Sequence, residues 1–525
     1  MMKIKNRFVY IMFSVVLGSL VLTTSCNKQL DVKSPRQQDE KNQWTKYEDA
    51  RSGLFGLYGL FRAAVADNNA HWLYGELRQG DFRSVVRPDL KAIVEGKLNA
   101  SYPAIQSITN WRRFYAVINA CNLFIERADG CLADKRYTEA YYKLDIAQAK
   151  TIRAFVYFYM VRIWGDVPLI TNTNEGQFEA LPRTKAEDVL AFAEKDLIEV
   201  APRLPFLYSG NDPEQKYPAN YYNNDSDTWL NTPLNRLAAY SLLSHIAAWS
   251  GRYIDVAIYT EYIVNNFQKS NLSMLGINGL TGAAGSSGGS VFDTRLNNFN
   301  QLIGFSFIQN RGETSTSGHI EQLTLANTTR YPMSKQSPDI YVPKEIISEM
   351  FPAENGNDDR FGLDKRFTPA LISEAYFENY NAEIPVFKKI RVIDGGAGAT
   401  GQFAVFNSAI IFTRLEEIRL LRAEALTVLG QESGAAEELN KVKVNRNIKP
   451  FSVGSAEDLL TAIFDERRRE LLGEGWRWYD LVRYNRIKRN DPEFNKLLDE
   501  GGIYWPISQE VLNRNPNISQ NSYWK

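Results

Sequence analysis

The fold is decided by one stretch of the chain, DIAQAKTIRAFVYFYMVRIWGDVP at residues 145–168. From Asp145 to Trp164 it is apolar on nearly every side, which predicts a helix buried within the protein rather than lying at its surface. Gly165 and Pro168 follow directly, an order typical of a helix C-terminus. A helix this apolar needs other elements packed all around it, so the stretch predicts a helix-rich protein.

Further helical segments lie on both sides of this central helix. We predict helices over residues 47–65, 108–127, 234–250, 256–267, 415–429 and 435–445. Thr232 is the expected N-cap of the 234–250 helix, with Pro233 after it. Gly251 and Gly430 separate the last four segments into two pairs, a pattern typical of tetratricopeptide-like helical hairpins. A strict repeat of about 34 residues is absent, which predicts scattered helix pairs instead of a continuous solenoid.

A different kind of sequence separates these pairs. Residues 270–410 are rich in Gly, Ser, Asn and Pro and show little helical periodicity. A long segment of this kind is usually a functional surface carried by a rigid frame. We therefore expect an all-α scaffold, at about residues 45–268 and 411–525, with a loop-rich lobe at about 270–410 inserted into it.

Composition and charge exclude several classes of protein. Hydrophobic residues make up 44% of the 525, enough to fill a core. Lys and Arg (61) balance Asp and Glu (61), so the basic footprint of a nucleic-acid-binding protein is missing. Three widely spaced His and three Cys residues argue against zinc sites and disulfide-rich scaffolds, and we expect no metal and no cofactor. Whether Cys121 and Cys131 pair stays open at this level.

The N-terminus has the form of a lipoprotein signal peptide. Basic residues come first, an uncharged apolar run of 15 residues follows over 8–22, and small residues lead directly into Cys26. The run is short for a membrane span but suits a cleaved signal. We expect a signal peptide at 1–25, one domain at 26–525, and lipid attachment at Cys26, whose acyl chains would hold the protein on a membrane.

Two glycine-rich motifs resemble catalytic or cofactor sites. Residues 285–289 fit G-x-S-x-G but lack the preceding strand and following helix of a nucleophile elbow, which favours a flexible loop. Residues 396–401 fit G-x-G-x-x-G and follow the strand-like run 390–393. The next residues, 402–407, also read as a strand and not as the helix that a pyrophosphate site requires. A hairpin turn is therefore favoured over a dinucleotide site.

Charged motifs in the second half of the chain have structural interpretations. We expect Asp358, Arg360 and Asp364 to lie in a solvated loop with local salt bridges. Arg467 shares a helix face with apolar side chains, which predicts that it reaches a buried carboxylate. Neither group provides the nucleophile, base and metal set of an enzyme.

Four motifs in order resemble the SusD/RagB family of Bacteroidetes lipoproteins. They are CNKQLDV at 26–32 followed by Pro35, the stretch RAFVYFYMVRIWGDVPL at 153–169, the run ERRRELLGEGWRWYDLVR at 466–483, and the end of the chain with WPI at 505–507 and NPN at 515–517. The resemblance spans essentially the whole mature chain.

The resemblance implies a surface-exposed, all-α protein of the outer membrane, with four tetratricopeptide-like helix pairs supporting an irregular lobe. Members of the family act as non-catalytic lids on a SusC-like TonB-dependent barrel, to which they pass captured glycans or, in some branches, peptides. We thus expect a lipid-anchored protein facing the outside that binds an oligosaccharide or peptide and no nucleic acid. A membrane-anchored hydrolase of glycans or peptides is the alternative, and a structural or adhesin role is a third.

A candidate ligand site lies between the first two predicted helices, in HWLYGELRQGDFRS at 71–84. Sugar recognition needs aromatic faces and planar polar groups, and this segment has both. In SusD-like proteins this early segment borders the ligand site. We expect ligand binding by Trp72, Tyr74, Asp81 and Arg83, with Trp229 and Phe292 as weaker candidates. The alternative is that Trp72 and Tyr74 pack against the first helix and that Asp81 pairs with Arg83.

Overall fold

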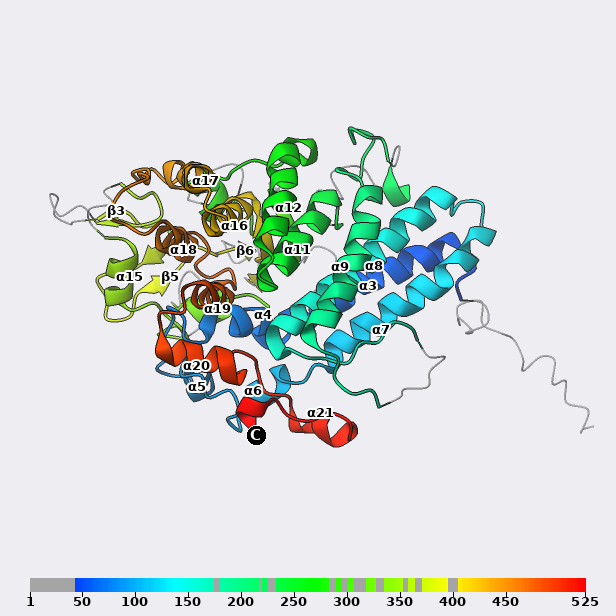
Figure 1. The fold of residues 1–525 in the computed structure, drawn as a ribbon, viewed down its shortest axis with the longest axis horizontal. Coiled ribbons are helices and arrows are strands. Elements are labelled where there is room, and N and C mark those ends of the chain that lie inside the picture. The colour runs from blue at the N-terminus through cyan, green and yellow to red at the C-terminus, as the bar shows by residue number, and fades with distance from the viewer. Residues whose placement is uncertain are drawn as a thin grey trace, which may run out of the picture.

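The computed structural model describes residues 43–173, 180–216, 220–223, 233–282, 289–293, 300–305, 318–326, 335–352, 357–363, 371–394 and 405–525. Outside this part lie the signal peptide 1–25, Cys26, Trp229, Thr232, Asp364, the run 283–288 and the glycine motif at 396–401. The described part is predominantly helical, with short strands, and the expected all-α class is confirmed (Figure 1).

The helices follow one another along the whole chain. Those of the first half are α3 (Tyr47–Ala66), α4 (Ala70–Trp72), α5 (Pro88–Val94), α6 (Pro103–Ile108), α7 (Arg112–Arg127), α8 (Glu139–Trp164), α9 (Ala186–Val200), α11 (Arg236–Trp249) and α12 (Tyr253–Asn266). Those of the second half are α13 (Ile277–Thr281), α14 (Glu321–Thr324), α15 (Lys344–Met350), α16 (Leu415–Val428), α17 (Glu432–Asn445), α18 (Leu459–Glu470), α19 (Arg477–Lys488), α20 (Pro492–Glu500) and α21 (Gln509–Arg514).

Helix α8 is the centre of the scaffold. Every residue from Thr151 to Trp164 is buried, as its apolar sequence predicts. Each large apolar side chain buried in this way contributes about 1.5–3 kcal/mol. The helix ends at Gly165, whose φ of 74° is strained for residues with a Cβ, and the N–H of Gly165 closes the last turn on the Val161 carbonyl at 2.9 Å.

Pairs of antiparallel helices build the rest of the scaffold. α8 packs against α7 and α9, and α3 covers α7 and α8 (Figure 1). α11 pairs with α12 and α16 with α17, while α12 lies against α16 and joins the two pairs. Gly251 and Gly430 take positive φ values of 73° and 74° in the two turns. The predicted helical hairpins are confirmed.

Short antiparallel strand pairs occupy the loop-rich lobe. They are β1 (Gln301–Phe305) with β8 (Ile410–Arg414), β2 (Gly362–Leu363) with β3 (Leu371–Ser373), β4 (Phe377–Glu378) with β5 (Val386–Phe387), and β6 (Ile393–Asp394) with β7 (Val405–Phe406). In the last pair Ile393 lies opposite Phe406. This antiparallel pairing is what the predicted hairpin requires, while the glycine motif itself lies outside the described residues.

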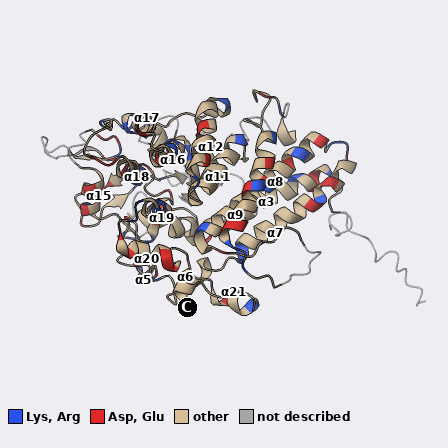
Figure 2. Cartoon of the chain, viewed as in Figure 1, with Lys and Arg blue, Asp and Glu red and all other residues tan. Residues whose placement is uncertain are grey.

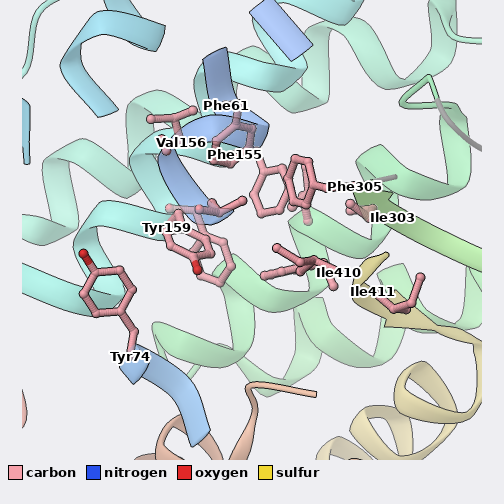
Figure 3. Close-up of a cluster of buried hydrophobic side chains, with 14 of the residues drawn as sticks. Phe61, Tyr74, Phe155, Val156, Tyr159, Ile303, Phe305, Ile410 and Ile411 are labelled. Carbon is pink, nitrogen blue, oxygen red and sulfur yellow. The ribbon is translucent and has the colours of Figure 1, made fainter. Parts of the chain in front are cut away.

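The lobe is attached to the scaffold through a shared apolar core. Phe61 of α3 contacts Phe155 of α8 edge-on, with ring centroids 4.8 Å apart, and Phe305 of β1 at 5.0 Å. Figure 3 shows Ile410 of β8 next to these rings. The β1–β8 pair thus joins the two ends of the lobe and packs them against the central helices.

Several helix boundaries differ from the prediction, and both α12, at Tyr253, and α17, at Glu432, begin three residues early. α8 begins at Glu139, six residues early, because Tyr141 and Leu144 already pack inward from a mostly polar first turn. The helix expected at 108–127 is α7, which begins four residues late at Arg112, and Ile108 is instead the last residue of α6. The N-cap of α11 is Asn235, whose side-chain oxygen accepts from the Ala238 N–H at 2.9 Å, so the cap predicted at Thr232 is wrong.

The remaining sequence features have clear positions. Cys121 and Cys131 are buried free thiols. Basic and acidic residues are interspersed along the helices (Figure 2). A search of the described residues finds no helix with both the length and the hydropathy of a membrane span.

Candidate functional site

The predicted ligand-binding residues lie on a segment that connects the scaffold to the lobe. After α3 the chain turns through Asn68 and Asn69, whose φ values of 53° and 56° place both in the left-handed region. It continues through α4 and a π-helical turn at Leu73–Leu77, and then runs extended past the lobe. Arg83 forms a bridge there with Tyr341, in which each backbone N–H donates to the other residue's carbonyl at 2.8 and 3.0 Å.

Trp72 and Tyr74 are core residues. Each is 1% exposed. The indole N–H of Trp72 donates to the Gly318 carbonyl at 3.5 Å, and the Tyr74 hydroxyl donates to the Ile108 carbonyl. Tyr74 also meets the ring of Trp505 edge-on at 5.2 Å (Tyr74 is labelled in Figure 3). Neither ring has a free face for a sugar, and the geometry favours the packing alternative. Direct ligand contact by these two residues stays a prediction without geometric support.

Asp81 is also buried, at 2% exposed, and forms ion pairs with Arg468 at 2.6 Å and Arg477 at 3.1 Å. The packing alternative supposed that Asp81 pairs with Arg83, and this pairing is not formed. The guanidinium of Arg83 donates instead to the carbonyls of Gly80 and Phe82 at 2.8 and 2.9 Å. Arg83 is half-buried, so among the four predicted residues it is the one with solvent access.

Phe292, a weaker candidate, is fully buried and offers no surface to a ligand. Trp229, the other one, lies outside the described residues.

Asn68 and Asn69 are two residues of this segment that the sequence analysis did not single out. The side-chain oxygen of Asn69 accepts from the Gly318 N–H at 3.0 Å, and its amide nitrogen lies 3.5 Å from Gln322. Asn68 is exposed and donates to Ser107 at 2.8 Å. Two consecutive asparagines directly after a helix favour such a turn, since Asn tolerates positive φ. The pair fixes the point where the scaffold meets the lobe.

A buried carboxylate holds the same segment against the C-terminal helices. Glu76 accepts the N–H groups of Gly473 and Gly475 at 2.8 and 2.9 Å. Burial raises the pKa of Glu76 to about 7, and the two backbone hydrogen bonds oppose that rise. Gly475 has a φ of 81°, and any Cβ there would meet the ring of His71, so glycine is required at this contact.

A buried ion network joins the lobe to α16 and α18. Glu470 accepts from Arg360 at 3.1 Å, from Arg414 at 2.7 Å and from Arg446 at 2.7 and 2.8 Å. Burial alone would raise the pKa of Glu470, but the guanidinium groups, Arg446 foremost, hold it well below its usual range. Arg360 also pairs with Asp358 at 2.9 Å, and both are buried. The local salt bridge is confirmed, whereas the expected solvent exposure of Asp358 and Arg360 is wrong because Arg360 points inward to Glu466 and Glu470 of α18.

The predicted carboxylate partner of Arg467 is confirmed. Its guanidinium pairs with Glu417 at 2.8 Å and with Asp480 at 2.9 Å, and all three side chains are buried. The carboxylates of α16, α18 and α19 are thus used to hold helices together. Within the part of the chain that the structure describes, no group of three or more His, Cys, Asp and Glu side chains is arranged to hold a metal ion.

One solved structure resembles the chain over nearly its whole length. The crystal structure of a SusD superfamily protein from Bacteroides thetaiotaomicron is 40% identical in sequence, with a TM-score of 0.81 over 92% of this chain and all of the other. The chain belongs to the SusD family.

Other comparisons agree with this SusD assignment. The SusD family model matches residues 299–496, and a model described as "Starch-binding associating with outer membrane" matches residues 83–216. SusD-like protein P38 of Formosa agariphila is 25% identical over 99% of both chains. A second SusD homologue from Bacteroides thetaiotaomicron, at 24% identity and a TM-score of 0.70 over 91% of this chain and 99% of its own, shares the fold. The resemblance read from the four motifs is confirmed.

Proposed function

We propose that this SusD-like protein is a surface-tethered nutrient-binding protein that captures an oligosaccharide, or a peptide, without cleaving it. It then delivers the ligand to a SusC-like TonB-dependent barrel in the outer membrane. The observation that carries this proposal is the match of residues 83–216 to a family described as starch-binding and associated with the outer membrane. The match at 40% identity over 92% of the chain places that segment in a complete SusD scaffold.

We place the capture surface along the boundary between scaffold and lobe. Asn68, Arg83 and the loop tip at Val85 and Val86 lie there with solvent access, and the two valines are 65% and 55% exposed. The buried side chains of Trp72, Tyr74 and Asp81 do not contact the ligand in this proposal. They hold the backbone of residues 71–84 in place beneath the capture surface. A rigid frame of this kind lowers the entropic cost of ordering a binding surface.

Binding without turnover agrees with the state of the ionisable groups. The strongly perturbed carboxylate Glu470 is enclosed among arginines, Glu417 is held by His245 and Arg467, and Glu76 accepts two backbone N–H groups. A general acid or base must reach its substrate within hydrogen-bond distance, and these groups are fully buried. Their perturbed pKa values are explained by structural roles.

Anchoring through Cys26 completes the proposed arrangement. Two or three acyl chains would hold the protein at the membrane surface, where a barrel can receive the ligand. The test is uptake of a fluorescent oligosaccharide by cells lacking this gene, complemented with the wild-type gene or with a gene encoding Cys26→Ala. We expect uptake to be restored only by the anchored protein, which also co-purifies with a TonB-dependent barrel. Full uptake in the uncomplemented strain would contradict the proposal.

A further inference from the structure

A cleft of about 660 Å³ opens on the scaffold between α7, the turn after α8 and the C-terminal helix α21. Its lining residues come from α7, α21 and the segments beside them, and α21 lies away from α15 and the strands of the lobe (Figure 1). Its size falls in the range of small-molecule sites, about 300–1,000 Å³. Neither Asn68 nor Arg83 of the proposed capture surface is among the residues that line the cleft.

The walls of the cleft are fixed by hydrogen bonds between segments distant in sequence. The Tyr115 hydroxyl donates to the Pro168 carbonyl at 2.6 Å, and the Asn515 amide donates to the Leu181 carbonyl at 2.9 Å. Asn110 donates to Glu510 at 2.8 Å. A site with walls held in this way is formed before any ligand arrives, which reduces the cost of binding.

The interior of the cleft is mostly apolar. Its floor is one face of α7, where Tyr115 and Ala116 lie side by side, and its walls include Ile170, Leu181 and Ile518. Ala116 is exposed, so the floor has room for an apolar group. Removing such a group from water stabilises a complex. The body of the occupant is therefore apolar.

The mouth of the cleft carries an excess of positive charge. Arg112 and Arg514 line it together with one acid, Glu510, which is already paired with Arg514 at 2.8 Å. None of the described residues pairs with the Arg112 guanidinium. None accepts from or donates to the side chain of Asn119, which lies about two turns further along the same face of α7. A planar guanidinium without a partner matches a carboxylate in a two-pronged contact.

We propose that this cleft binds a small amphipathic carboxylate, with its apolar body on Tyr115 and Ala116 and its carboxylate on Arg112. Asn119 then forms a hydrogen bond with an amide or hydroxyl group next to the carboxylate. Two sources share this chemistry: the C-terminal end of a short peptide with an apolar last residue, and a medium-chain fatty acid. The proposal does not rest on the capture of glycans and concerns a second ligand.

The test uses calorimetric titration of the full chain carrying Cys26→Ala with three probes: N-acetyl-leucyl-phenylalanine, its C-terminal amide, and decanoate. We expect one carboxylate probe to bind at one site per chain. Arg112→Gln should weaken it at least about 10-fold, because the charge-assisted contact is lost. Ala116→Trp should abolish binding by filling the floor.

Matched controls separate the cleft from general effects. Arg127→Gln changes an exposed arginine at the other end of α7, and Ala140→Trp places a large ring on the exposed first turn of α8. Both should bind like the parent chain, and all four variants should melt like it, since the changed side chains are exposed. Acid preferred over amide assigns a peptide source, whereas Arg112-dependent binding of decanoate alone assigns a lipid source. Equal binding of acid and amide, binding unaffected by both cleft variants, or no binding of any probe at 1 mM would overturn the proposal.

Discussion

Glu470→Gln tests whether the buried ion network holds the lobe to the scaffold. The change keeps the shape of the side chain and removes its charge. Arg360 keeps Asp358 and Glu466, and Arg414 keeps Glu474, but Arg446 is left with Glu416 at 3.9 Å as its nearest carboxylate. Removing one partner of a buried ion pair costs about 3–5 kcal/mol, because a charge stays buried without compensation. We expect a loss of that size in the free energy of unfolding.

The assay is urea unfolding followed by tryptophan fluorescence, with Glu48→Gln as the control. Glu48 pairs with Arg136 at 2.7 Å on the surface, where water replaces a lost partner, so this variant should unfold like the wild type. Adding Arg446→Met to Glu470→Gln should recover part of the loss, since it removes the uncompensated charge. A loss below about 1 kcal/mol for Glu470→Gln, or no recovery in the double variant, would refute the reasoning.

Three further predictions concern the anchor, the buried aromatic segment and pH. Cys26→Ala should move the protein from the outer-membrane fraction to soluble material; retention on the membrane in cells without the barrel would count against lipid attachment at Cys26. Trp72→Ala should lower the unfolding free energy by about 3–5 kcal/mol, because the ring is buried; an unchanged melt with ligand affinity at least about 10-fold weaker would instead restore direct ligand contact by Trp72. Burial raises the pKa of Asp145 to about 7 despite hydrogen bonds from Tyr221, Tyr222 and Tyr137, so the folded state binds the extra proton between the unfolded value near 4 and about pH 7. Its stabilisation is present at low pH and is lost as pH rises through 7, so Asp145→Asn should flatten the fall in stability between pH 5 and 8 by no more than about 3 kcal/mol; identical pH profiles would exclude this role.

Much of the fold follows from local patterns along the chain. The run up to Trp164 is apolar on all sides, and only a helix at the centre of the protein can bury it. The central position of α8 was therefore predictable from the sequence. Gly251 and Gly430 mark turns because positive φ favours glycine. The start of α7 at Arg112 was missed although Asn110 carries a local signal for it, since Asn favours helix starts and its side-chain oxygen accepts from the Arg112 N–H at 3.0 Å. The end of α6 at Ile108 is also held by packing, because the Tyr74 hydroxyl donates to the Ile108 carbonyl.

The candidate site was less readable for a physical reason. Aromatic and charged residues close together suit both a ligand surface and a tightly packed joint. Asp81 pairs with Arg468, which is 387 residues away in the sequence, and with Arg477 further along the chain. No local pattern reports such a contact. The two asparagines at 68 and 69 did carry a signal, since consecutive Asn residues after a helix favour positive φ.

The central claim is capture of a nutrient ligand without turnover. The most direct measurement incubates the purified Cys26→Ala chain with a library of oligosaccharides and peptides, then analyses bound and free ligands by mass spectrometry. We predict that at least one ligand is retained by the protein with its mass unchanged after prolonged incubation, and that EDTA does not alter the result. Shortened oligosaccharides or peptides, formed in proportion to the amount of protein, would contradict the account.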